Sequence, residues 1–161
     1  MLKAFYRRQL PHLQRDNKPH FLTFCTDHRW ILPQQVRSIV LDCCVHDEGT
    51  KIDLQVAVVM PDHVHMIFTP LVNEQAMEVR SLAEIMDAIK GSSAHKINKA
   101  LERKGRIWQP ESFDHVLRSF EGLAQKVQYL LENPVRKGLV SQWQNYPWIW
   151  QKPFTSPYAP Q

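Results

Sequence analysis

The sequence predicts an α+β protein with a ferredoxin-like βαββαβ order, an antiparallel sheet and one additional helix near the C-terminus. Short segments rich in β-branched and aromatic residues alternate with longer segments of helical periodicity, and this alternation gives the order of elements. A Pro-Asp pair at positions 61 and 62 separates two adjoining apolar runs, which is typical of a β-hairpin. The 161 residues are 43% hydrophobic, enough to bury the core of a single domain over 1–161.

The first half of the chain is expected to contain one helix and three strands. Residues 21–26 are rich in aromatic and β-branched residues, which is typical of a strand. From Gln34 to about Asp47 apolar residues recur at helical spacing, and Gly49 is expected to end this helix. The expected elements are a strand over 21–26, a helix from Gln34 to about Asp47, and two hairpin strands over 52–60 and 64–69.

The second half is expected to begin with a polar loop over residues 73–80. Ser81 and Glu84 form a capping-box pattern, so a helix starts there and is expected to run to about Arg103. The following segment, residues 113–118, alternates well enough in polarity to be a fourth strand.

Both ends of the chain differ in composition from its middle. Residues 1–20 form a polar, basic arm that includes Arg7 and Arg8, and this arm is either solvated or in contact with nucleic acid. Residues 143–161 are rich in aromatic residues and proline without a helical period, so we expect an extended tail. The aromatic side chains of this tail either patch the core or lie over a functional face.

The charge balance is mildly basic and the cysteines form no framework. Lys and Arg number 20 against 16 Asp and Glu, and the net charge of +4 permits nucleic acid as a partner without requiring it. The three cysteines, Cys25, Cys43 and Cys44, contain no C-x-x-C pair, which favours a reducing compartment. We see no secretion signal and no apolar run near the roughly 20 residues of a membrane span, so a soluble, cytoplasmic protein without a membrane partner is expected.

Two histidines interrupt the second hairpin strand beside the turn. Because side chains alternate along a strand, His63 and His65 share one face and Val64 points to the other. Paired histidines on a strand are either polar residues on a solvated face or half of a metal site. Their position beside a turn, where functional groups tend to lie, favours the metal site.

The additional helix is expected over residues 120–133 and ends there because Pro134 clashes with helix continuation. Tyr129 falls roughly opposite the apolar stripe and shares its face with Gln125 and Asn133, each one turn away. A tyrosine in this position is either surface decoration or a reactive group. The apolar stripe that defines the other face consists of Phe120, Leu123, Val127, Leu130 and Leu131.

Three stretches of the chain resemble a known family. The stretches are 58–65 (VVMPDHVH), 108–118 (WQPESFDHVLR) and 129–140 (YLLENPVRKGLV). Together they resemble the REP-associated tyrosine transposases, a one-tyrosine branch of the HUH single-strand nucleases. The likeness runs from about Phe21 to about Trp148.

The resemblance implies a metal-dependent enzyme that cleaves and rejoins single-stranded DNA carrying REP-type hairpins. It implies that Tyr129 on the additional, catalytic helix attacks DNA and forms a 5′-phosphotyrosine. It also implies that His63, His65 and Asn133 bind a divalent cation, Mg²⁺ or Mn²⁺. Related transposases often carry Gln in place of the amide ligand Asn133. The protein is expected to act as a monomer or a homodimer.

Basic residues beside an aromatic residue suit single-stranded nucleic acid, because phosphates meet cations and bases stack on rings. Such a group lies at the far end of the second expected helix, and further cations follow the additional helix. The expected DNA-binding residues are Arg7, Arg8, Lys96, Lys99, Arg103, Lys104, Arg106, Trp108, Arg118, Arg136 and Lys137.

Two other function classes stay open from the sequence. The first is a single-strand nucleic-acid-binding module without chemistry, because a sheet with aromatic residues serves single strands well. The second is a zinc-dependent hydrolase built on the histidine pair, which would need a further Glu or His ligand nearby.

Overall fold

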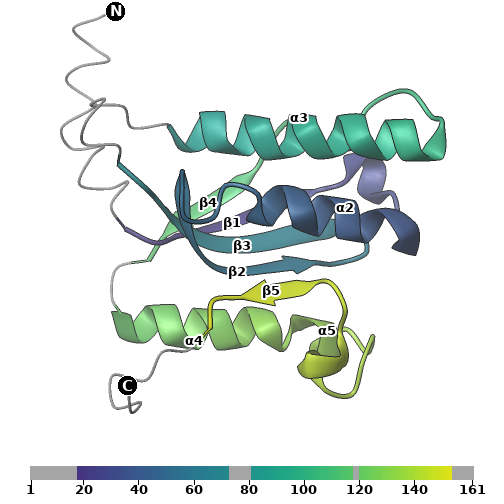
Figure 1. Cartoon of the computed structure of the whole chain (residues 1–161). Helices are drawn as coiled ribbons and strands as arrows, with labels where there is room; N and C mark the ends of the chain where they lie inside the picture. The colour runs from purple at the N-terminus through teal and green to yellow at the C-terminus, as the bar shows by residue number, and fades with distance from the viewer. Residues whose placement is uncertain (1–17, 73–80, 118–119, 154–161) are drawn as a thin grey trace, which may run out of the picture.

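The structure, a computed structural model, describes residues 18–72, 81–117 and 120–153. A five-stranded antiparallel sheet forms its middle layer, with α2 and α3 on one face and α4 on the other (Figure 1). The strand order across the sheet is β4-β1-β3-β2-β5. The predicted α+β class with an antiparallel sheet is confirmed. The expected loop over 73–80 lies outside the described residues.

Apart from the short turn η1, the elements follow the predicted order as far as α4, and three short elements, α5, η2 and β5, come after it. Within the described residues, no helix is both long and apolar enough to span a membrane. In chain order the elements are β1 His20–Cys25, η1 Asp27–Arg29, α2 Gln34–Val45, β2 Ile52–Val59, β3 His63–Pro70, α3 Leu82–Leu101, β4 Phe113–Val116, α4 Phe120–Leu131, α5 Asn133–Arg136, η2 Trp143–Asn145 and β5 Ile149–Gln151.

Local signals in the sequence set the bounds of the hairpin and of α3. The backbone N–H of Met60 donates to the carbonyl of His63 at 2.8 Å and closes the turn between β2 and β3. The Ser81 hydroxyl accepts a hydrogen bond from the backbone N–H of Glu84 at 3.2 Å, as the capping-box pattern predicts. The helix ends where Glu102 takes a left-handed conformation with φ of 52°.

One face of the sheet packs against α2 and α3 and forms the larger apolar core. From β3 it receives Val64, Met66 and Phe68, none of which has exposed surface. Trp108 also belongs to this core, where it packs edge-on against Phe24 with ring centroids 4.9 Å apart. The expectation that bases stack on Trp108 is therefore wrong, because its ring is buried and its Nε1 donates to Ser93 at 2.9 Å.

The other face of the sheet packs against α4. Ile67 of β3 meets the last apolar residues of α4, Leu130 and Leu131, which are buried as the helical stripe predicts. Leu123 and Val127 pack against the same cluster and are partly buried. The side chain of Phe120 is outside the described part of the structure.

The predicted end of the additional helix is corrected by two residues. The helix α4 ends at Leu131, and a further helical turn, α5, begins at Asn133. Pro134 lies in the first turn of α5, where a missing backbone N–H leaves no helical hydrogen bond unmade. Proline therefore starts a new turn here in place of ending the chain's helical path.

The described part of the C-terminal tail, residues 143–153, patches the core, which is the first of its two expected roles. β5 pairs with β2 at the edge of the sheet, and the Tyr146 hydroxyl donates to the carbonyl of Val59 at 2.6 Å. The indole N–H of Trp148 donates to the Ser38 hydroxyl at 3.2 Å. The tail is thus partly a strand and partly a 3-10 turn, because the edge of β2 offers it backbone partners. Residues 154–161 lie outside the described residues.

Candidate active site

The histidine pair lies on the face of the sheet that α4 covers. His63, His65 and Ile67 alternate with the core residues of β3, and Ile67 packs against α4. The two imidazole rings meet at an angle of 76°, with centroids 4.7 Å apart. The prediction that the two side chains share a face agrees with this geometry.

Each histidine is held through its Nδ1 atom. Nδ1 of His63 lies 2.7 Å from a carboxylate oxygen of Asp62, and Nδ1 of His65 lies 2.7 Å from the hydroxyl of Thr23. Because a carboxylate only accepts, the contact with Asp62 places a proton on Nδ1 of His63 and leaves Nε2 with a free lone pair. Arg29 donates from Nε to the other oxygen of Asp62 at 3.0 Å and fixes that carboxylate. This arrangement of an oriented imidazole is the one that metal-binding histidines use.

Burial keeps both imidazoles neutral. It lowers the pKa of His63, against the raising effect of Asp62, and it lowers the pKa of His65 to about 3. The positive charges of Arg136 and Lys137 lower the pKa of His65 further. Neutral imidazole is the form that binds metals, so the pair is ready to act as a ligand at neutral pH.

Tyr129 stands half-exposed on α4 between two cations. The guanidinium carbon of Arg136 lies 3.8 Å from the centroid of the Tyr129 ring, and Nη2 donates to the Tyr129 carbonyl at 2.7 Å. The ammonium of Lys126, one turn earlier on α4, lies 5.2 Å from the same ring. With 54% of its surface exposed, the side chain is open to a partner as large as a DNA strand.

A chain of contacts links Tyr129 to the histidine pair. The Lys126 ammonium also lies 5.4 Å from the ring of Phe21 on β1, and that ring lies 5.6 Å from the His65 ring. Arg136 covers Tyr129 and acts electrostatically on His65. These contacts place Tyr129 on the same side of the sheet as the two histidines.

Asn133 is buried at the start of α5, three residues before Arg136. Its side-chain nitrogen has no hydrogen-bond partner among the described residues, which is costly for a buried polar group. Rotating the amide by half a turn exchanges its two ends and would bring an oxygen, a metal-binding atom, to the unpaired position. Asn133 is buried whereas Tyr129 is exposed, so the two do not share a solvent-facing side as expected.

The side chains available to hold a divalent cation combine nitrogen donors from two imidazoles with an oxygen donor from one amide. The described residues contain no group of three or more His, Cys, Asp or Glu side chains able to hold a metal. Two imidazoles and an amide oxygen suit Mn²⁺, and Mg²⁺ prefers oxygen donors. The further Glu or His ligand that a zinc hydrolase needs is not found beside the pair within the same residues.

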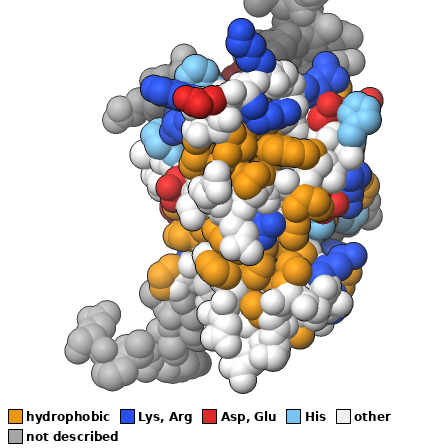
Figure 2. All heavy atoms as spheres, turned by 90° about the vertical axis from the view of Figure 1, so that its right-hand side faces the viewer, with side chains coloured by type: hydrophobic (Ala, Val, Ile, Leu, Met, Phe, Trp, Pro, Cys, Tyr) orange, Lys and Arg blue, Asp and Glu red, His pale blue; other side chains and the backbone are white. Residues whose placement is uncertain are grey.

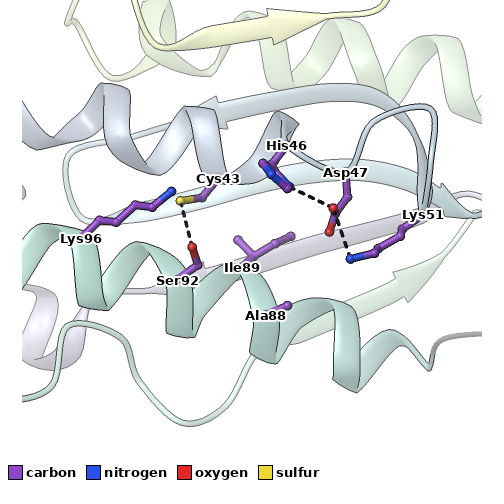
Figure 3. Close-up of a pocket in the computed structure, with 8 residues that line it drawn as sticks. All are labelled: Cys43, His46, Asp47, Lys51, Ala88, Ile89, Ser92 and Lys96. Atoms are coloured by element: carbon purple, nitrogen blue, oxygen red, sulfur yellow. Dashed lines mark hydrogen bonds and ion pairs between the residues drawn. The ribbon is translucent and has the colours of Figure 1, made fainter.

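The expected DNA-binding residues separate into two groups. Arg136 and Lys137 lie beside the histidine pair, whereas Lys96 and Lys99 lie on α3, across the sheet from α4. Figure 3 shows Lys96 at a pocket between α2 and α3 that contains no other expected site residue. Arg7, Arg8 and Arg118 lie outside the described residues.

The loop after α3 offers exposed cations, and one of them is already engaged. Arg103 lies over the Trp30 ring at 4.6 Å and donates to the Asn98 side chain at 3.0 Å. Lys104 and Arg106 are exposed. Figure 2 shows Lys and Arg side chains scattered around a central group of hydrophobic side chains on the end face of the molecule. Positive charge is therefore spread over this face and forms no single track.

Sequence reasoning missed the residues that support the site. Phe21, Thr23 and Lys126 contact the histidine pair or Tyr129, and Asp62 orients His63. Asp62 had a local signal, since it precedes His63 directly. Thr23 had none, because its contact with His65 depends on the register in which β1 pairs with β3.

Comparisons with known proteins concern the fold and the part of the site that holds His63 and His65. A family model described as "Transposase IS200 like" matches residues 14–121. A Haemophilus influenzae protein named as a REP-associated tyrosine transposase is 26% identical over 94 residues, which are 56% of this chain and 53% of that protein. A solved structure described as a REP-associated tyrosine transposase bound to a REP hairpin has a TM-score of 0.62 at 23% identity, covering 83% of this chain and 76% of that one.

These likenesses have definite bounds. The chain spans about half the length of the curated relative that it matches, and the likeness to the solved structure shows the fold alone. The match to a solved Deinococcus radiodurans protein described as a transposase covers 69% of this chain and 86% of the other chain at 23% identity. Its TM-score is 0.47, so it carries no argument. The family match includes His63 and His65 and stops before Tyr129 and Asn133, so those two rest on the geometry above.

Proposed function

The chain belongs to the family of IS200-like transposases, and on this premise we propose that it cleaves and rejoins single-stranded DNA through a covalent bond to Tyr129. The observation that carries the proposal is the meeting of two features on one face of the sheet. A pair of neutral histidines held by their Nδ1 atoms lies there beside an exposed tyrosine flanked by two cations.

The proposed reaction exchanges one phosphodiester for another. The Tyr129 oxygen attacks the phosphorus of a DNA linkage, loses its proton, and forms a bond to the 5′-phosphate. The bond from phosphorus to the 3′ oxygen breaks, and the released strand ends in a 3′-OH. Because the bond energy is retained in the phosphotyrosine, a second 3′-OH can attack it and join two strands without a nucleotide cofactor.

A divalent cation, Mg²⁺ or Mn²⁺, belongs to this proposal. His63 and His65 would hold it through Nε2, and Asn133 would supply its amide oxygen once the amide is rotated by half a turn, since the end now unpaired carries the nitrogen. When bound, such a cation polarises a non-bridging phosphate oxygen and neutralises the charge that develops on it. Asp62 and Thr23 keep the imidazoles oriented for this contact.

We propose hairpin-containing single-stranded DNA as the substrate. The support is the resemblance of residues 58–65, 108–118 and 129–140 to REP-associated tyrosine transposases, together with the solved relative described as bound to a REP hairpin. Exposed cations beside the site, above all Lys137, are suited to the backbone phosphates of such a strand.

The test is a search for the covalent intermediate. The protein is incubated with 5′- and 3′-labelled hairpin strands and Mg²⁺, Mn²⁺ or a chelator, and the products are separated on denaturing gels. We expect a protein–DNA adduct only with metal, and peptide mapping by mass spectrometry places the DNA on Tyr129. Hairpin DNA that binds without any adduct under all conditions would support the alternative, a binding module without chemistry.

A further inference from the structure

We propose that Arg136 is a positioning residue that holds the Tyr129 ring in its attacking orientation, and that gripping phosphate is not its role. This inference rests on the proposed function of Tyr129 as the nucleophile. It replaces the sequence-based expectation that Arg136 and Lys137 act alike as phosphate contacts.

Arg136 is tied to Tyr129 at two points. Its guanidinium carbon lies 3.8 Å from the ring centroid, well inside the range of a cation–π contact. Its Nη2 donates to the Tyr129 carbonyl at 2.7 Å. That carbonyl belongs to the last turn of α4, where backbone oxygens lack partners within the helix. One side chain therefore satisfies the backbone of Tyr129 and covers its ring.

The break between α4 and α5 is what makes this double contact possible. α4 ends at Leu131, and α5 starts at Asn133 with Pro134 in its first turn. The change of helical path brings Arg136 back over a residue seven positions earlier. In one continuous helix the carbonyl of Tyr129 would accept from the backbone N–H of Asn133, four residues later, and would not need the Arg136 guanidinium as its donor.

A half-exposed nucleophile needs such a restraint. A tyrosine with 54% of its surface exposed is free to exchange between staggered χ1 rotamers, which move its hydroxyl by several ångströms. Attack on phosphorus requires the oxygen in line with the leaving group, and only one rotamer supplies that geometry. Arg136 fixes the ring from α5, and Lys126 approaches it from the preceding turn of α4.

Lys137 offers the matched contrast. It is the next residue, it carries the same charge, and like Arg136 it is exposed. Within the described part of the chain its ammonium makes no hydrogen bond or ion pair, and its backbone N–H donates to Asn133 at 3.0 Å. The Lys137 ammonium is therefore free to meet a phosphate, whereas Nη2 and one face of the Arg136 guanidinium are already in contact with Tyr129.

Three variants separate positioning from phosphate binding: Arg136→Lys, Arg136→Gln and Lys137→Gln. Arg136→Lys keeps the charge and can still donate to the Tyr129 carbonyl, but it lacks the planar group that covers the ring. We expect the single-turnover rate of adduct formation to fall roughly ten- to a hundredfold in both Arg136 variants, with the Kd for hairpin DNA unchanged. Lys137→Gln is expected to raise that Kd and to make binding less sensitive to salt.

A second readout needs neither DNA nor metal. The protein is labelled with 3-fluorotyrosine, and the ¹⁹F resonance of Tyr129 is assigned by its loss in Tyr129→Phe. In Arg136→Lys we expect this resonance to move toward the position of free fluorotyrosine, while circular dichroism shows an unchanged fold. If Arg136 only capped the Tyr129 carbonyl, the resonance would stay in place in Arg136→Lys, since lysine can still donate to that carbonyl.

The outcomes are distinguishable from failure of the proposed function. If the wild-type protein forms no adduct, the proposed function fails, and the ¹⁹F measurement still reports on the ring contact. If the wild type forms the adduct and Arg136→Lys matches its rate, the positioning role is overturned. A parallel rise in Kd and loss of rate in both Arg136 variants would equally overturn it, because that pattern belongs to a phosphate contact.

Discussion

The two faces of the sheet take different residues from the same strand. Toward α2 and α3, β3 contributes Val64, Met66 and Phe68, which have no exposed surface. Toward α4 it contributes His63 and His65 before returning to an apolar residue, Ile67. The difference teaches that one face of the sheet can hold the fold together while the other carries polar groups. Substitutions on the two faces should therefore have separable effects.

The largest expected effect is on the face of the sheet that α4 covers, called the polar face here because it carries His63 and His65. His63→Ala or His65→Ala should abolish cleavage of hairpin DNA with little loss of DNA binding, because each removes one of the two imidazoles proposed to hold the cation. Cleavage is measured on denaturing gels and binding by fluorescence anisotropy, both with metal present. Full cleavage by either single variant would remove the histidine pair from the mechanism.

The apolar face should respond in stability. Phe68→Ala is expected to lower the free energy of unfolding by about 3–5 kcal/mol, because a fully buried aromatic side chain leaves a cavity. Urea unfolding followed by circular dichroism measures the change. Phe113→Ala is the control, since Phe113 is 62% exposed on β4 and its loss should leave stability nearly unchanged. Equal losses in the two variants would contradict the assignment of the core.

The polar face should also carry a pH dependence in the metal-free protein. Burial lowers the pKa of His65 from 6.5 to about 3, so the unfolded chain takes up a proton below pH 6.5 and the folded chain does not. Stability is therefore lost as the pH falls from 6.5 toward 3, by roughly 2 kcal/mol between pH 7 and pH 5. Urea unfolding with a chelator measures this loss, and His65→Gln should reduce it. An unchanged pH dependence in His65→Gln would show that the loss arises elsewhere.

The smallest effect concerns a second tyrosine on the α4 face. Tyr146→Phe removes the hydrogen bond to the carbonyl of Val59, and we expect it to cost about 1 kcal/mol of stability. Burial raises the pKa of Tyr146 to about 12, against the lowering effect of Arg37. The folded chain therefore keeps this proton while the unfolded chain loses it near pH 10, and stability falls between those values. In Tyr146→Phe this alkaline loss should be absent from unfolding curves.

The sequence predicted which residues lie on each face of the sheet wherever the prediction depended on a short segment of the chain. Alternation along β3 and the helical stripe of α4 predicted which residues point to the core. The contact between Thr23 and His65 was not predictable, because it depends on strand register, which no short segment of sequence specifies. Trp108 was misjudged because basic neighbours describe the composition of a loop and not the direction of an aromatic side chain.

The helix end shows the same limit. Pro134 is a reliable sign that a helix changes there, and α4 does end close by. Whether the chain then leaves the helical path or begins a new turn depends on the packing of α5. The contact of Arg136 with Tyr129, seven residues earlier, follows from that turn and has no counterpart in the periodicity of the sequence.

The central claim is that Tyr129 is the nucleophile of the polar face, and a matched pair of tyrosine variants tests it most directly. Tyr129→Phe and Tyr146→Phe each remove one hydroxyl and keep the ring, so both should fold and bind hairpin DNA. Each is incubated with labelled hairpin DNA and Mn²⁺, and the adduct is measured on a denaturing gel. We predict no adduct with Tyr129→Phe and an adduct with Tyr146→Phe. An adduct that persists in Tyr129→Phe would contradict the account.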